Sequence, residues 1–337
     1  MLTDVIRAGR ADLYSIFRTR AHDCARALAI EDGSRKLTYA ELLERVDRLA
    51  AVFLARGVAP GDRIAILSHN RSEYLEVELA AAGIGAIVAC LNWRLAPDEL
   101  RHCIDLVEPV LAVVEPELSE AYRAVASTPC LTVGPDLETA IAGVEPDPRT
   151  GTMVDDPEAG LTILYTSGTT GLPKGAHISH RAHIARSMVF AAQLALDPGD
   201  GFIAWAPMFH MASTDHALAT ILRGGTVVMV DGLLPAVINE ALSRHRIGWF
   251  VMMPGALEAF INERHANPLP LKGIKVCGAM ADLVPPHQIA ELTGLLDTPY
   301  LNSFGATETG LPPGTADLIA PGVTPNRLSK RISAFCE

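Results

Sequence analysis

The stretch LYTSGTTGLPKGAHISH, residues 164–180, joins a run of apolar residues to a helical pattern. It is rich in glycine, and glycines let backbone N–H groups point inward to form an anion-binding concavity. Lys174 adds a compact positive charge on a flexible stem. The glycines are Gly168, Gly171 and Gly175, and the hydroxyl donors are Thr166, Ser167, Thr169 and Thr170. The stretch therefore predicts a phosphate-binding loop, although it lacks the Gly-Lys-Ser/Thr run of the common nucleotide loop.

Strand and helix patterns alternate around this loop. Residues 161–166 indicate a strand before it, and residues 181–196 indicate a helix after it. The clearest helix spans residues 38–57, where Thr38 and Glu41 can form a capping box. Similar alternation continues to the end of the chain. It predicts an α/β fold with a mostly parallel sheet that is covered by helices on both faces.

Composition narrows the class of protein. The chain has 337 residues, 49% hydrophobic and 20% charged, so it can bury a large core. A net charge of −11 without a basic stripe argues against a nucleic-acid partner. The six scattered cysteines lack a Cys-x-x-Cys pair, which favours a reducing, cytoplasmic location. The longest uncharged apolar run, residues 79–91, is shorter than the ~20 residues that span a bilayer, so we expect no integral membrane contact.

Residues 134–160 differ from the rest of the chain. They are rich in proline and acidic residues and poor in large apolar ones. This composition predicts a domain boundary or a long surface connection. We therefore expect a first α/β subdomain over residues 1–155 and a second over residues 156–337, which carries the phosphate loop and the nucleotide site.

Four segments together resemble the adenylate-forming, or AMP-binding, enzyme superfamily. YTSGTTGLPKG (165–175) is similar to its signature over nearly its whole length. APMFHMAS (206–213), VCGAM (276–280) and NSFGATETG (302–310) follow in the expected order and look most like the acyl-CoA synthetase branch. The resemblance implies two packed, mostly parallel β-sheets flanked by helices, as in the N-terminal domain of these enzymes.

The resemblance also implies a reaction, the ATP-dependent ligation of an acid to a thiol. A carboxylate attacks the α-phosphorus of ATP, pyrophosphate leaves, and the full-length protein passes the acyl group to CoA. Charge builds on the phosphate oxygens, so positioned donors and a cation are needed. The residues implied to be catalytic are Lys174, His210, Thr307 and Glu308.

Individual roles follow from the same resemblance. The loop with Lys174 would hold the β- and γ-phosphates, Thr307 would bond the α-phosphate, and Phe304 would lie against the adenine. Glu308 would hold Mg²⁺, a hard cation that prefers carboxylate oxygen. The residues expected to contact ATP are Thr166, Ser167, Gly168, Thr169, Thr170, Gly171, Lys174, Gly278, Ala279, Asn302, Ser303, Phe304, Gly305 and Thr307. Those expected to bind the acid are His210, Met253, Pro254 and Gly278.

The histidines allow further interpretations. On its own, His210 after a phenylalanine is typical of a packed core or loop residue. The resemblance places it beside the substrate carboxylate, where a neutral imidazole could donate a hydrogen bond. His177, His180 and His183 have a spacing that suggests a metal site. That segment crosses from strand to helix, so the rings need not converge, and Mg²⁺ avoids imidazole.

Some alternatives stay open. Members of the family continue beyond this chain's last residue with a β-barrel, a ribose-binding aspartate and a mobile lid that supplies a second lysine. The resemblance therefore implies a chain truncated before the barrel, and we expect it alone to adenylate poorly or not at all. The acyl acceptor can be a carrier protein instead of CoA, and the chain can be a non-catalytic fragment that binds a nucleotide or an acyl group. A separate segment that carries the lid and a second copy of the chain in a homodimer are the possible protein partners. Asp215 leaves an amino-acid substrate open, since that branch of the family holds its substrate amine with an aspartate.

Overall fold

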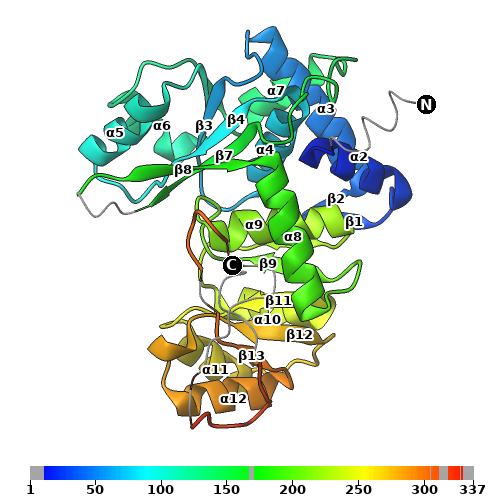
Figure 1. Ribbon diagram of the computed structural model, residues 1–337, viewed down its shortest axis with the longest axis vertical. Coiled ribbons are helices and arrows are strands. Elements are labelled where there is room, and N and C mark those ends of the chain that lie inside the picture. Colours follow the sequence, from blue (N-terminus) through cyan, green and yellow to red (C-terminus); the bar gives the residue numbers. More distant parts are fainter. Residues whose placement is uncertain (1–10, 167–170, 304, 311–317, 327, 329–337) are drawn as a thin grey trace.

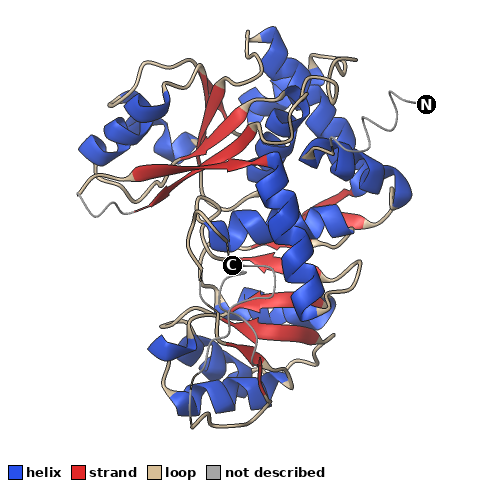
Figure 2. Cartoon of the chain, viewed as in Figure 1, coloured by secondary structure: helices blue, strands red, loops and turns tan. Residues whose placement is uncertain are grey.

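The computed structural model describes residues 11–166, 171–303, 305–310, 318–326 and 328. Its strands form two sheets, one above the other in Figure 1. The six-stranded sheet has the order β6-β5-β3-β4-β7-β8, and the eight-stranded sheet has the order β14-β13-β12-β11-β9-β10-β1-β2. Helices flank both sheets (Figure 2), so the predicted fold class is confirmed.

The six-stranded sheet is parallel except at one edge, where β7 and β8 pair antiparallel. Its strands are β3 (Arg63–Leu67), β4 (Ile87–Cys90), β5 (Leu111–Val114), β6 (Cys130–Thr132), β7 (Gly160–Thr166) and β8 (Lys174–Ser179). One face packs on helices α5 (Pro97–Val107) and α6 (Ser119–Arg123) through its own apolar cluster. The other face joins the main core.

The eight-stranded sheet is also parallel at its centre, with antiparallel pairs at its two edges. Its strands are β1 (Leu28–Asp32), β2 (Arg35–Thr38), β9 (Gly201–Ala204), β10 (Val227–Met229), β11 (Ile247–Val251), β12 (Ile274–Gly278), β13 (Tyr300–Leu301) and β14 (Leu318–Ile319). Parallel strands at the centre of a sheet are covered on both faces, which explains their continuous apolar sequences.

The remaining helices cover the sheets and fill the space between them. They are α2 (Leu13–Asp23), α3 (Tyr39–Ala55), α4 (Ser72–Ile84), α7 (Pro135–Ala142), α8 (His180–Leu194), α9 (Met211–Arg223), α10 (Pro235–Arg244), α11 (Leu257–Ala266) and α12 (Pro286–Leu296), with 3₁₀ turns at Pro116–Leu118 and Ala281–Leu283. Helix α4 packs against β3, β4 and β7 of one sheet and β1 of the other. All 13 of its residues are buried for that reason. Within the described ranges, no helix is both long enough and apolar enough to cross a bilayer.

The helix predicted over residues 38–57 is confirmed as α3. The Thr38 side chain accepts from the backbone N–H of Glu41, and the Glu41 carboxylate accepts from that of Thr38, which completes the capping box. Gly57 follows with φ +85°, the left-handed conformation that glycine adopts without strain. The helix begins and ends where its local sequence predicts.

The sheets do not divide at residues 155/156. Strands β1 and β2 come first in the chain but lie in the eight-stranded sheet, and β7 and β8 follow the boundary but complete the six-stranded sheet. The division into subdomains at that point stays a prediction. The segment 134–160, expected to be a domain boundary or a long surface connection, contains α7, which packs on α3 and contributes Glu138 to an ion pair with Arg45.

Candidate active site

The predicted phosphate loop is the connection of an antiparallel hairpin. Strand β7 ends at Thr166 and β8 begins at Lys174, and these two residues are partners in the pairing register. Strand β8 confirms the strand expected at the start of residues 177–183, although the sequence did not indicate that it begins at Lys174. Gly171 has φ +100°, which requires glycine, and the Lys174 side chain is exposed. Ser167, Gly168, Thr169 and Thr170 lie outside the described residues.

The base of the hairpin is anchored to the helix beside it. The backbone carbonyl of Pro173 lies 3.0 Å from Nε2 of His102 on α5. A Cβ at Gly175 would lie 2.8 Å from the Ile163 side chain, so glycine allows close packing within the hairpin. Lys174, Pro173 and His102 border a surface hollow of 530 Å³. The hairpin therefore presents its lysine and its glycine turn at the edge of the six-stranded sheet.

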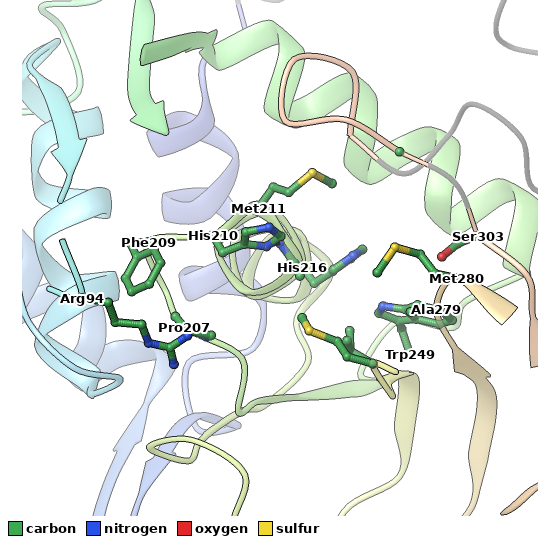
Figure 3. A pocket seen from close by; sticks show the side chains of 14 residues that line it. Arg94, Pro207, Phe209, His210, Met211, His216, Trp249, Ala279, Met280 and Ser303 are labelled. Carbon is green, nitrogen blue, oxygen red and sulfur yellow. Dashed lines mark hydrogen bonds between the residues drawn. The ribbon is translucent and has the colours of Figure 1, made fainter. Parts of the chain in front are cut away.

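A separate cavity of 290 Å³ lies where the N-terminal end of α9 faces the ends of β11 and β12 (Figure 3). Its wall is mostly apolar, and the larger apolar side chains in it are Phe209, Met211, Trp249, Val251, Met253 and Met280. Polar side chains among the lining residues are Arg94, His210, His216 and Ser303. An apolar cavity with a few convergent polar groups is typical of a small-molecule site.

His210 immediately precedes α9 and is oriented by it. Its Nδ1 accepts a hydrogen bond of 3.1 Å from the backbone N–H of Ala212, which makes His210 the N-cap of the helix. Surrounding protein atoms lower the pKa of His210 below its usual value, so the neutral imidazole is favoured. With Nδ1 acting as the acceptor, the neutral ring carries its proton on Nε2 and can donate it to a ligand.

The closed end of the cavity is aromatic. His216 and Trp249 have ring centroids 6.0 Å apart, and both pack on Phe190 of α8, with centroids at 4.6 and 5.4 Å. Burial lowers the pKa of His216 to about 3, so the ring is neutral. At the opposite end, the Arg94 guanidinium lies over the ring of Phe209, 5.8 Å from its centroid. These residues form a slot with aromatic groups at both ends.

The structure brings some of the predicted site residues to this cavity and separates others from it. The predicted residues that line it are His210, Met253, Ala279, Ser303 and Gly305. Those outside its lining are Thr166, Gly171, Lys174, Pro254, Gly278, Asn302, Thr307 and Glu308. Phe304 lies outside the described residues. Arg94, His216 and Trp249 also line the cavity but were not among the predicted site residues, because only packing of distant segments shows which face of each element meets the cavity.

Two predicted nucleotide contacts have structural roles in the described residues. Gly278 ends β12 with φ +137°, and a Cβ there would lie 2.5 Å from the carbonyl oxygen of Leu301 on β13. The Asn302 side chain is buried and accepts a 2.9 Å hydrogen bond from the backbone N–H of Ala281. Both residues therefore shape the turn after β12, whether or not a nucleotide is bound.

Thr307 and Glu308 lie in a turn that a buried arginine holds. The Arg186 guanidinium donates to the carbonyl oxygens of both residues. It also pairs with Asp215, which does not line the cavity. The Glu308 side chain is exposed and forms no ion pair with another described residue.

The three histidines spaced along residues 177–183 do not converge. The His177 ring packs over Gly160, Nδ1 of His180 accepts from the backbone N–H of Leu13, and Nε2 of His183 lies 2.9 Å from the Thr162 hydroxyl. Across the described part of the chain, no three His, Cys, Asp or Glu side chains are grouped to hold a metal ion. A single exposed carboxylate such as Glu308 still suits Mg²⁺, which keeps several waters and binds substrate phosphates.

Known proteins are similar to this chain in sequence and in fold. The family model described as AMP-binding enzyme matches residues 17–329, and the chain belongs to that family. It is 34% identical over 241 residues to a feruloyl-CoA synthase of Amycolatopsis sp., covering 71% of this chain and 48% of that one. It is 31% identical over 297 residues to an indoleacetate–CoA ligase of Aromatoleum aromaticum, covering 83% and 57%. The solved structure of ATP-bound MatB from Rhodopseudomonas palustris matches with a TM-score of 0.78 and 25% identity, covering 92% and 63%. The chain spans about half the length of the curated relatives it matches.

Proposed function

We propose that this protein activates a small aromatic carboxylic acid with ATP and transfers the acyl group to the thiol of CoA. The observation that carries the proposal is the 290 Å³ cavity beside His210, closed by Trp249. Its size and aromatic walls suit an acid with one or two rings rather than a long acyl chain. Two relatives named as a feruloyl-CoA synthase and an indoleacetate–CoA ligase support this substrate class.

The N-terminal end of α9 would orient the carboxylate. Its helix dipole favours negative charge at that end, and the neutral His210 ring can donate from Nε2. A neutral donor fixes the carboxylate without the strong attraction of a full positive charge, so the carboxylate oxygen keeps its nucleophilicity. His210 is thus proposed as the residue that aims the carboxylate at the nucleotide.

The first step joins the acid to the nucleotide. A carboxylate oxygen forms a bond to the α-phosphorus of ATP, the bond between this phosphorus and the bridging oxygen breaks, and pyrophosphate leaves with the electron pair. Lys174 and the hairpin turn would hold the leaving phosphates, and the Thr307 hydroxyl would donate to the α-phosphate. Glu308 would hold Mg²⁺, which supplies positive charge at the phosphate oxygens. In the second step the CoA sulfur forms a bond to the acyl carbon, the bond between that carbon and the phosphate oxygen of AMP breaks, and AMP leaves with the electron pair while the thiol proton passes to solvent.

A thermal-shift experiment tests the proposal with this chain. ATP with Mg²⁺, and aromatic acids such as phenylacetate and cinnamate, are added separately and together. Ligands that bind only the folded state raise the free energy of unfolding by ~2.7 kcal/mol at a hundred times Kd. We expect stabilisation by ATP and by at least one aromatic acid. No response to any nucleotide would overturn the proposal.

A further inference from the structure

Arg186 connects the turn at Thr307 and Glu308 to the core. It lies on α8 and is 9% exposed. Its Nη2 donates to the carbonyl oxygen of Thr307 at 3.0 Å and to that of Glu308 at 2.7 Å. Its Nη1 donates to Oδ2 of Asp215 at 3.0 Å. One planar guanidinium thus joins two backbone carbonyls and one carboxylate, an arrangement that the single ammonium of lysine does not reproduce.

Buried polar side chains lie next to Asp215. Oδ1 of Asp215 lies 3.4 Å from Nδ1 of His183, and Nε2 of His183 lies 2.9 Å from the hydroxyl of Thr162. Thr162 is fully buried in β7, the strand that leads into the phosphate hairpin. His183 thus lies between Thr162 of β7 and the Arg186–Asp215 pair, but Nδ1 of His183 and Oδ1 of Asp215 form no hydrogen bond with each other.

The turn is also shaped around the arginine stem. Gly310 has φ +75°, and a Cβ there would lie 3.0 Å from Cδ and 3.1 Å from Nε of Arg186. Gly310 and Ala306 pair through their backbones, which closes the turn over the guanidinium. Within this turn, Arg186 donates to backbone carbonyls rather than to side chains.

We propose that Arg186, anchored by Asp215, is a positioning residue for the nucleotide site. It fixes the backbone of Thr307 and Glu308, so that the hydroxyl and the carboxylate are already oriented when the nucleotide and Mg²⁺ arrive. This inference rests on the proposed function, because it assigns Glu308 to the metal and Thr307 to the phosphate. Arg186 acts through these residues, since three of its N–H groups already donate to protein oxygens.

The test compares nucleotide and metal affinity in three folded proteins: the wild type, Arg186→Met and Arg186→Lys. Calorimetry measures ATP binding in the presence of Mg²⁺, Mg²⁺ binding to the ATP complex, and binding of the aromatic acid alone. Loss of an outer partner of a metal ligand lowers metal affinity by about 10–100-fold. We expect that loss for Mg²⁺ in both variants. Affinity for the acid should remain within about twofold, because Arg186 does not line the cavity.

Arg45→Met is the matched control. Arg45 also forms ion pairs through a partly buried guanidinium, with Glu76 and Glu138, but far from the turn. This variant should lose stability while it keeps the wild-type affinities for ATP and Mg²⁺. If Arg186→Met does not fold, Asp215→Asn removes the charge of the anchor with little change in shape and should weaken Mg²⁺ binding in the same direction.

The outcomes separate the two proposals. Wild-type protein that binds ATP with Mg²⁺, together with Arg186 variants of unchanged affinity, would overturn the positioning role and leave the proposed function intact. Wild-type protein that binds no ATP would overturn both. A uniform loss of affinity for acid and ATP in the Arg186 variants would indicate general damage to the fold and would also overturn the specific role.

Discussion

Nδ1 of His210 accepts a 3.1 Å hydrogen bond from the backbone N–H of Ala212. The neutral ring therefore carries its proton on Nε2, and His210 lines the cavity. One side chain therefore caps helix α9 and offers a donor to the substrate. Because the two roles use different nitrogens, substitutions can separate them.

Replacing His210 with serine should separate capping from catalysis. Serine is a good N-cap, so His210→Ser should keep nearly the wild-type melting temperature, whereas His210→Ala should lose ~1 kcal/mol of stability. Both variants lack the Nε2 donor, and both should lose about 100-fold in the rate of acid activation. Acid-dependent ATP–pyrophosphate exchange and thermal melts measure the two effects. Full activity in His210→Ser would contradict the proposed donor.

Filling the cavity should block the acid but not the nucleotide. Met253 is half-buried, lines the cavity and follows β11, so Met253→Trp adds volume into the cavity at modest cost to the fold. We expect this variant to lose stabilisation by aromatic acids in thermal-shift measurements while it keeps stabilisation by ATP with Mg²⁺. Met253→Leu is the volume-conserving control and should respond to both. An unchanged response of Met253→Trp to the acid would show that the acid binds elsewhere.

Glu78 should make stability depend on pH. Burial raises the pKa of this carboxyl from its usual 4.5 to about 8, and its Oε1 accepts from the Thr214 hydroxyl at 3.3 Å. Between these values the folded state holds a proton that the unfolded state has released, so the free energy of unfolding falls as pH rises from about 4.5 to 8.

The variant Glu78→Gln cannot ionise and should show a flatter dependence. Each pKa unit corresponds to ~1.4 kcal/mol, so its stability relative to wild type should rise by at least ~1 kcal/mol between pH 5 and 8. Urea denaturation at several pH values measures this change. Parallel stability curves for the two proteins would show that the carboxyl is not protonated in the fold.

Replacing Gly278 with alanine should destabilise the fold. Its φ of +137° and the 2.5 Å approach of a Cβ to the Leu301 carbonyl both oppose alanine. Gly273, at the other end of β12, has φ +112° but no atom within 4 Å of its Cβ position. Both alanine variants should lose ~1–3 kcal/mol from backbone strain. Gly278→Ala should lose more, and equal losses in urea denaturation would rule out the contact as a cause.

The sequence predicted those parts of the fold that depend on residues close together in the chain. The capping box at Thr38, the glycine at Gly57 and the strand over residues 161–166 all lie where the sequence places them. The hairpin of β1 and β2 could not be assigned to the eight-stranded sheet, because β1 pairs with β10 almost 200 residues later. Pairing at such distance is decided by packing, which leaves no periodic pattern in the sequence.

In the candidate site, too, residues within motifs were predicted and residues brought together by distant packing were not. His210, Met253 and Ser303 came from motifs, and the structure places all three on one cavity. Arg186 belongs to none of the recognised motifs. A charged residue on a helix usually faces solvent, and two of its partners lie 29 and 121 residues away, so the sequence did not indicate its role. Trp249 and His216 were not selected as site residues, because residues of these types, when buried, mostly belong to the core.

The most direct test of the central claim is calorimetric titration with a non-hydrolysable aryl-adenylate analogue. Such a compound links the two halves that the cavity and the nucleotide motifs are proposed to bind together. Linking two bound groups makes the second binding event intramolecular, so we predict one site per chain with a Kd at least ~100-fold below that of AMP or of the free acid. An analogue that binds no more tightly than AMP would contradict the claim that acid and nucleotide share this site.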